Sequence, residues 1–193
     1  MPDRDVSTIC NVINYQYAKI IACSAFRCKN SFEAKKKHYG IIKNTFRDLS
    51  AGKKSWSDIE REDWQLVESD KKCAYCGSIS VLAREHIVPG SLLINERCPS
   101  CDTMQSIHNK VWACKSCNSQ KGTEGLYSFY KKRLPMEKKF FDYIPPLIEK
   151  KYLKTVYQCI SRCTHFLKSG DIDGDGNLTV LDIDFVMKQC RKL

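Results

Sequence analysis

Closely spaced cysteines are the most chemically suggestive residues of the chain. Three Cys-x-x-Cys pairs stand within forty-five residues, namely Cys73/Cys76, Cys98/Cys101 and Cys114/Cys117. Any two such pairs can place four thiolates tetrahedrally around one zinc ion. Gly77, directly after Cys76, suits the tight turn of a zinc knuckle. The pairs therefore predict a structural zinc site, but spacing alone leaves three combinations of two pairs open.

The total cysteine content bears on the redox setting. The chain has 12 cysteines, and its first ten residues are too polar and acidic for a secretory signal. We therefore expect a cytoplasmic protein in which paired cysteines bind metal instead of forming disulfides. The six cysteines outside the pairs are isolated or at helical spacing, and we expect them to be small core residues. They are Cys10, Cys23, Cys28, Cys159, Cys163 and Cys190.

Two further stretches follow the first cysteine pair in a characteristic order. REHIVPG covers residues 84–90, and HNKVWACKSCNSQKG covers residues 108–122. A lone histidine is usually a surface or hydrogen-bonded residue. Here His86 directly follows an acid, while Asn109 and Asn118 stand on either side of the cysteine pair Cys114/Cys117. Over about fifty residues, this order resembles the zinc-braced form of the HNH endonuclease family.

The resemblance implies a ββα-metal core, in which a two-stranded hairpin and a helix hold one divalent cation. It assigns His86 as the general base that activates water and Asn109 as the residue that orients it. It makes Glu85 and Asn118 ligands of a catalytic magnesium or manganese ion. The structural zinc ligands that it implies are Cys73, Cys76, Cys114 and Cys117.

Elementary chemistry is consistent with these residue types. Phosphodiester hydrolysis needs a deprotonated water and a cation that offsets charge on the phosphoryl and leaving oxygens. An imidazole with a near-neutral pKa suits the first task. Carboxylate and amide oxygens suit magnesium, whereas thiolates suit a closed zinc site that acts as a brace.

Two features depart from a simple version of this site. Neighbouring residues on a regular strand face opposite sides, so Glu85 and His86 can share a site only where the strand is twisted, bulged or ending. The nearby Pro89 and Gly90 are consistent with an ending. The pair Cys98/Cys101 lies in an insertion outside the family pattern, and both a metal role and a plain reduced loop are open for it.

The elements that must position these residues divide the chain into four regions. Residues 1–70 are predicted to be helical, with helices over 7–26 and 32–49 and a capping box at 57–60 that begins a third. Residues 71–125 form the expected nuclease core, with β-like runs at 80–83, 85–88 and 110–113. Residues 126–168 are basic and helical, interrupted at Pro135 and resumed after Pro145, and 169–193 form an acidic loop and a last helix. The fold class is therefore α+β.

The charge distribution indicates a polyanionic partner. The net charge is +10, and residues 126–168 alone hold ten basic and three acidic residues. Candidate phosphate contacts are Lys115, Lys121, Lys131, Lys132 and Arg133. Interleaved aromatic residues over 127–143 could stack on bases, although aromatics at helical spacing are more often core. We expect DNA as the partner, in double-stranded form, and no membrane segment.

Residues 171–182, DIDGDGNLTVLD, resemble an EF-hand or dockerin-type calcium loop. The resemblance assigns calcium ligands to Asp171, Asp173, Asp175, Asn177 and Asp182. Gly176 provides the sharp turn, and the competing interpretation is a solvated acidic turn. Because one loop is present, we expect a structural calcium that braces the C-terminal helices.

The sequence thus predicts an HNH-type endonuclease that hydrolyses DNA with a histidine base and one divalent cation. Two other classes stay open: an inactive zinc-braced nucleic-acid-binding module and a calcium-dependent interaction protein. These residues do not indicate the target sequence, whether one strand or both are cut, or whether the substrate is DNA or RNA. They do not indicate the biological role either. The oligomeric state is also open, with a homodimer among the choices.

Overall fold

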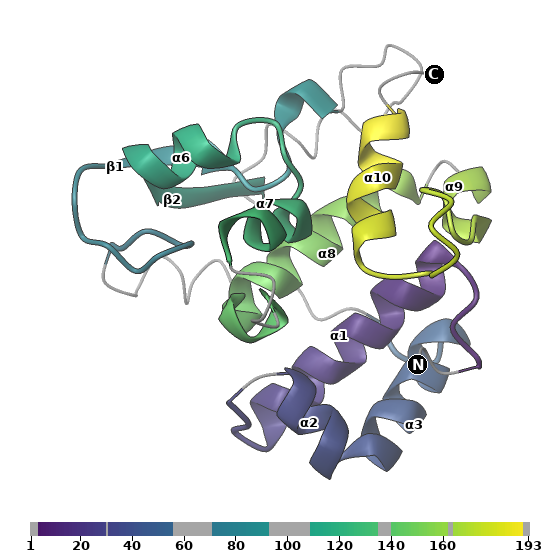
Figure 1. Cartoon of the computed structure of the whole chain (residues 1–193). Coiled ribbons are helices and arrows are strands. Elements are labelled where there is room, and N and C mark those ends of the chain that lie inside the picture. Colours follow the sequence, from purple (N-terminus) through teal and green to yellow (C-terminus); the bar gives the residue numbers. More distant parts are fainter. Residues whose placement is uncertain are drawn as a thin grey trace.

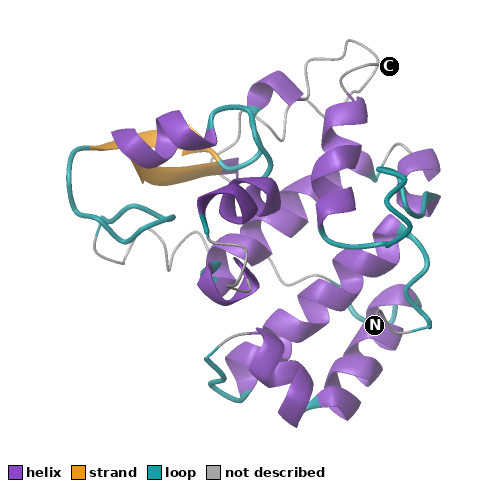
Figure 2. Ribbon diagram, viewed as in Figure 1, coloured by secondary structure: helices purple, strands orange, loops and turns teal. Residues whose placement is uncertain are grey.

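A computed structural model describes residues 4–29, 31–55, 71–92, 109–134, 140–161 and 164–190. In this part of the chain, a group of helices packs beside one small two-stranded antiparallel sheet, which lies at one edge of the molecule (Figures 1 and 2). The fold is therefore mixed α and β, as the sequence predicts. Helix and strand labels below follow Figure 1.

Three helices form the N-terminal region. They are α1 (Ile9–Ala25), α2 (Ser31–Lys37) and α3 (Tyr39–Ser50). Thr8 caps α1, and its hydroxyl accepts a hydrogen bond from the amide of Asn11. Helix α1 packs against α2 and α3 on one side and against α8, α9 and α10 on the other, so it joins the N-terminal and C-terminal regions (Figure 1).

The central unit is a strand–strand–helix arrangement. Strand β1 (Leu82–His86) pairs antiparallel with β2 (Lys110–Cys114), and helix α6 (Lys115–Lys121) follows β2 directly. A short 3-10 helix, Gly90–Leu92, follows β1. In the register, Glu85 lies opposite Val111 and His86 lies opposite Lys110. Figure 1 shows α6 lying across the hairpin.

The C-terminal half is helical in the described residues. It contains α7 (Leu126–Arg133), a 3-10 turn (Phe140–Tyr143), α8 (Pro146–Ile160), α9 (Thr164–Lys168) and α10 (Leu181–Cys190). Pro146 occupies the first turn of α8, where its missing amide hydrogen costs nothing. Helix α10 contacts α7 and α1.

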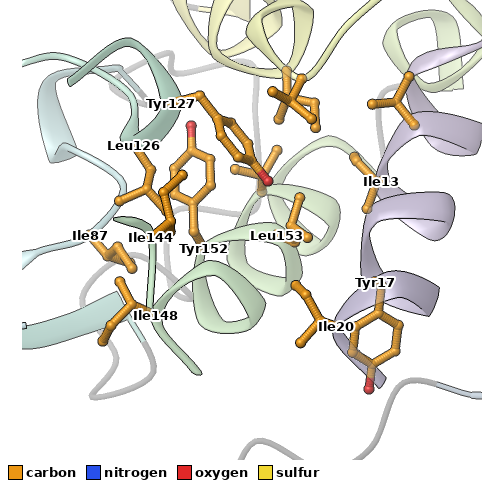
Figure 3. Packing of buried hydrophobic residues seen from close by; sticks show 14 of the residues in the cluster. Ile13, Tyr17, Ile20, Ile87, Leu126, Tyr127, Ile144, Ile148, Tyr152 and Leu153 are labelled. Atoms are coloured by element: carbon orange, nitrogen blue, oxygen red, sulfur yellow. The ribbon is translucent and has the colours of Figure 1, made fainter. Parts of the chain in front are cut away.

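One hydrophobic core runs through the molecule. Ile13 and Ile20 of α1 meet Leu153 of α8, and Tyr127 and Tyr152 pack edge to face nearby (Figure 3). Buried carboxylates lie within it. Glu149 accepts hydrogen bonds from the Gln16 amide at 2.6 Å and the Tyr127 hydroxyl at 3.0 Å. The helices are therefore joined by polar as well as apolar contacts.

A buried carboxylate also joins α10 to α7. Asp184 accepts hydrogen bonds from the Ser128 amide, in the first turn of α7, and from the Tyr152 hydroxyl. A methyl group on Gly125, the N-cap of α7, would overlap this carboxylate. The C-terminal helix thus caps the helix that follows the central unit.

Several predicted helices agree with the structure and one needs correction. The first helix is confirmed as α1, and the basic region contains α7 and α8. The single helix predicted over 32–49 is wrong because the chain breaks at His38, whose backbone leaves helical geometry (φ −128°, ψ 32°) and whose ring stacks on Phe26. The predicted capping box at 57–60 and its helix lie outside the described residues.

The predictions for the aromatic residues and for the unpaired cysteines can be compared with the burial of these side chains. Tyr127, Phe129 and Tyr130 are buried, so they are core side chains and not a stacking surface. Cys23 and Cys159 are buried as predicted, whereas Cys10 and Cys28 are only partly buried. Cys163 lies outside the described residues. Among the helices that the structure describes, none has both the length and the apolar character needed to span a bilayer.

Candidate metal centre and hairpin site

Four cysteines from two distant segments come together beside the hairpin. The Sγ atoms of Cys73, Cys76, Cys114 and Cys117 all lie within 4.8 Å of one another. Cys73 and Cys76 lie on a turn in which the Gly77 amide bonds the Cys73 carbonyl at 2.8 Å. Gly77 has φ +75°, a conformation that favours glycine, so the residue after the pair allows the turn to close.

The second cysteine pair lies at the junction of β2 and α6. Cys114 ends the strand and is the N-cap of the helix, and Cys117 lies in its first turn. The Ala74 amide donates to the Trp112 carbonyl at 2.8 Å, which fastens the first turn to β2. The strand-to-helix transition therefore places the second pair against the first.

Local electrostatics act in opposite directions on the cysteines of this cluster. The backbone amide of Cys117 lowers the pKa of Cys114 to about 7, and burial raises the pKa of Cys117 to about 12. The Arg133 guanidinium donates to Cys117 Sγ at 3.1 Å and brings a positive charge from α7. Four converging thiols are a soft donor set of the number and type that zinc takes in closed structural sites. These four cysteines could therefore bind a structural metal such as zinc. Cys98 and Cys101 lie outside the described residues.

A buried ion pair lies between the hairpin and α6. Lys121, the last residue of α6, is fully buried, and its Nζ lies 3.0 Å from Oε1 of Glu85. The same ammonium donates to the His86 carbonyl at 3.3 Å. Burial raises the pKa of Glu85, and Lys121 opposes this rise. Glu85, the expected ligand of the catalytic metal, therefore already has one carboxylate oxygen paired with the Lys121 ammonium.

The buried Tyr75 completes this cluster. Its carbonyl accepts a hydrogen bond from the Tyr130 hydroxyl at 3.0 Å, and its ring packs against Phe129. Burial raises the pKa of Tyr75 well above its usual value, and the charge of Glu85 adds to the effect. Glu85 Oε2 and the Tyr75 hydroxyl interact electrostatically, yet neither atom forms a hydrogen bond of standard geometry.

His86 is the last residue of β1, so the strand ends where the sequence argument requires it to end. Its Nε2 is buried without a hydrogen-bond partner. Burial, together with the charges of Lys110 and Lys121, lowers the pKa of His86 below its usual value. The imidazole is therefore neutral near pH 7, which is the state that a general base requires.

Asn109 clamps the chain beside His86. Its Oδ1 accepts from the Val88 amide and its Nδ2 donates to the Val88 carbonyl, each at 2.9 Å. The Asn109 carbonyl also accepts from the Ile87 amide at 2.8 Å. Asn109 is fully buried, so the clamp is protected from water. It holds the backbone that follows His86, which is one way in which an asparagine can orient that ring.

Asn118 lies in the middle of α6, three residues before Lys121. Residues three apart on a helix lie on the same side, so Asn118 is on the side of α6 that faces β1. Glu85 and Asn118 thus lie on the facing sides of β1 and α6, whereas strand alternation places the His86 side chain, opposite Lys110, on the other face of the hairpin. Buried atoms without partners, Glu85 Oε2 and His86 Nε2, are the kind that a bound cation or water satisfies. Of these groups, the Glu85 carboxylate and the Asn118 amide carry the oxygen donors that magnesium or manganese prefers, and a cation site here stays a prediction.

The candidate phosphate contacts are not equivalent. Lys121 is wrong as a surface contact, because its side chain is fully buried and paired with Glu85. Lys132 is exposed but pairs with Glu124, while Arg133 contacts Cys117. Lys115 and Lys131 are exposed, and their predicted role stays a prediction.

The acidic loop gathers three of its expected ligands. Carboxylate oxygens of Asp171, Asp173 and Asp175 lie within 4.8 Å of one another on the surface. Asn177 donates its amide to Asp175. Asp182 is buried and accepts from the backbone amides of residues 172 and 179, so it already organises the loop. Calcium binding here stays a prediction.

Comparison with known proteins does not assign the chain to a family. No family model, no curated protein and no solved structure matches the chain.

Sequence reasoning missed the roles of Lys121 and Tyr75. The motif CNSQKG places Lys121 at helical spacing after Cys117 (i+4), which is the available signal that it shares a face with a buried ligand. No comparable signal marks Tyr75, because its contact with Glu85 depends on how the first cysteine turn packs against β1.

Proposed function

We propose that this chain is a metal-dependent endonuclease of the HNH type, which hydrolyses DNA phosphodiester bonds with His86 as general base. The observation that carries the proposal is a strand–strand–helix unit, beside four gathered cysteines, in which a histidine ends the first strand. The resemblance in motif order and this arrangement support each other, because the motifs imply such a unit.

Each residue of the unit has a defined task in this proposal. Nε2 of His86 takes a proton from the attacking water. Asn109 keeps the ring in place through the backbone of Val88. The second oxygen of Glu85, which lies near the Tyr75 hydroxyl, and the amide of Asn118 would hold a magnesium or manganese ion, which would offset charge on the phosphate. The zinc would stay coordinatively closed and hold β2, α6 and the first cysteine turn together.

Cleavage of supercoiled plasmid with added magnesium tests the proposal directly. The parent protein should nick or linearise the plasmid, and His86→Ala should lower the rate by about a hundredfold or more, the usual loss for a general base. His165→Ala is the matched control, because His165 is an exposed histidine on α9. If His86→Ala cuts as fast as the control, the assignment of the base is wrong.

A zinc-braced nucleic-acid-binding module without hydrolytic activity is the second candidate. The ion pair between Lys121 and Glu85 favours it, because a carboxylate that is already neutralised needs no metal. Asn118→Ala separates the two candidates. An endonuclease should lose magnesium-dependent cleavage in this variant and keep DNA binding, whereas a pure binding module shows no cleavage in either form.

We also propose that the loop 171–182 holds a structural calcium ion. Three carboxylates so close together repel one another unless a cation is bound. Calcium should raise the melting temperature of the parent protein and leave that of Asp173→Asn nearly unchanged. A large calcium effect on cleavage or on near-UV circular dichroism would favour a regulatory role over this bracing role.

A further inference from the structure

The hairpin has a second face, turned away from α6, that carries positive charge around an aromatic ring. We call it the cationic hairpin face, and it comprises Lys71, Arg84, Lys110 and Trp112. Strand alternation separates it from the helix-facing side, where Glu85 and Val111 are buried. Arg84 lies directly opposite Trp112 in the register. This face is therefore a distinct surface of the central unit.

Trp112 organises two of these cations. Lys71 Nζ lies 5.3 Å from the centre of a Trp112 ring, and the guanidinium carbon of Arg84 lies 5.4 Å from it. Such cation–π contacts hold long, mobile side chains over a ring face at little cost. The indole thus contacts two exposed positive charges.

The three cations have no acidic counterpart in the described part of the chain. The ion pairs found there involve other lysines, including Lys37, Lys54, Lys121, Lys132 and Lys188. An array of uncompensated cations held in place by an aromatic ring complements a polyanion.

The position of the face relative to His86 indicates which polyanion. Lys110 lies directly opposite His86, and Arg84 precedes His86 by two residues on the same strand. Residues two apart on a strand share a face and are about 6.8 Å apart along it. The row of Arg84, Trp112 and Lys110 therefore leads along the hairpin to the histidine at its end.

We propose that the cationic hairpin face binds the phosphodiester backbone of nucleic acid and leads it to His86. The choice of nucleic acid rests on the proposed nuclease function, while the surface itself rests on the geometry above. An acidic protein could neutralise the same charges. The row of cations that ends at the expected catalytic histidine favours a continuous phosphate chain over scattered carboxylates.

Two exposed apolar side chains precede the hairpin in the sequence. Ile79 and Val81 are 84% and 88% exposed, on the loop between the first cysteine turn and β1. Proteins that bind the minor groove often place apolar side chains beside their phosphate contacts. A bound nucleic acid would remove these two from water, in agreement with the proposed occupant.

Fluorescence anisotropy with a short labelled DNA duplex, without added divalent cation, tests this surface apart from catalysis. The variant Lys71→Met/Arg84→Met should bind about 30-fold more weakly than the parent at about 0.15 M salt. The slope of log K against log salt should fall by about 1.8, the value for two lost phosphate contacts on duplex DNA. Lys110→Met alone should lower that slope by about 0.9.

The matched control is Lys36→Met/Lys53→Met, which removes the same charge from exposed lysines of the N-terminal region. Circular dichroism and zinc content check that all variants are folded. Three results would overturn the proposal: equal weakening in variant and control, no binding of duplex by the parent, or equally tight binding of polyglutamate.

The experiments distinguish a failure of the proposed nuclease function from a failure of the proposed binding surface. If the plasmid stays uncut while the duplex binds through this face, the nuclease function is wrong and the surface stands.

Discussion

The buried Lys121 offers the sharpest test of how the hairpin site is built. In Lys121→Met, the ammonium that lies 3.0 Å from Glu85 is lost, while the length and apolar stem of the side chain are kept. Glu85 is 8% exposed and keeps its place between β1 and α6. The variant therefore leaves a buried carboxylate without its counter-charge.

The expected cost follows from the burial of both partners. Removing one member of a buried ion pair usually costs about 3–5 kcal/mol of unfolding free energy. Glu85 can escape part of this by taking up a proton, since burial already raises its pKa. We therefore expect about 3 kcal/mol, or a fall in melting temperature of roughly 6–12 °C for a chain of this size. The double variant Glu85→Gln/Lys121→Met should recover at least half of the loss.

Thermal and urea denaturation of zinc-loaded protein provide the measurement. Lys131→Met is the control, because Lys131 is an exposed lysine of α7 and should change stability by less than about 0.5 kcal/mol. A parent-like stability of Lys121→Met would refute the inference that this ion pair is buried and coupled. Equal losses in the single and double variants would show that the introduced methionine side chain packs poorly and that charge is not the cause.

The same variant tests the expected catalytic cation. If Glu85 ligates magnesium, the ion should raise the melting temperature of Lys121→Met more than that of the parent, because it replaces the missing charge. Glu85→Gln/Lys121→Met should lose this gain. Equal magnesium effects in all three proteins would argue against Glu85 as a ligand.

Three further predictions concern the surrounding structure. Gly125→Ala should destabilise the protein by about 1–3 kcal/mol in urea denaturation, because its methyl group would overlap Asp184, whereas Gly40→Ala, which meets no neighbour, should not. Cys114→Ser should abolish stoichiometric zinc binding and lower the melting temperature; retained zinc would exclude this cluster as the site. Burial raises the pKa of Glu149, so the folded state binds a proton more tightly at this site than the unfolded chain does, and stability falls as pH rises through the titration of this group. Glu149→Gln should therefore weaken the decline in melting temperature between about pH 5 and pH 7, and an unchanged decline would refute the assignment.

Local chemistry made part of the site predictable. Cysteine pairs and their turn residues indicate a zinc knuckle, because ligand type and spacing are properties of a short segment. The spacing of three pairs could not choose among them, whereas the structure gathers Cys73 and Cys76 with the second pair at the β2–α6 junction. That choice depends on the pairing of two strands that are far apart in the sequence.

Burial of charged residues was not predictable in the same way. Lys121 was expected to contact phosphate at the surface, but α6 packs its last turn against β1 and encloses the ammonium with Glu85. Likewise, the predicted helix over 32–49 divides at His38, because the stacking of His38 on Phe26 joins two helices. Both outcomes follow from contacts between elements and not from the periodicity of either one.

The amino-acid sequence by itself determined the kinds of chemistry that this protein can support. The residue types and their order include the cysteine pairs, an acid directly before a histidine, and two asparagines. The spacing of apolar side chains around them indicates the helices. Only the tertiary structure decided which residues meet. Strand pairing set His86 opposite Lys110 and Arg84 opposite Trp112, and the packing of α6 across the hairpin buried Lys121, because those contacts depend on the register of β1 against β2 and on where α6 lies.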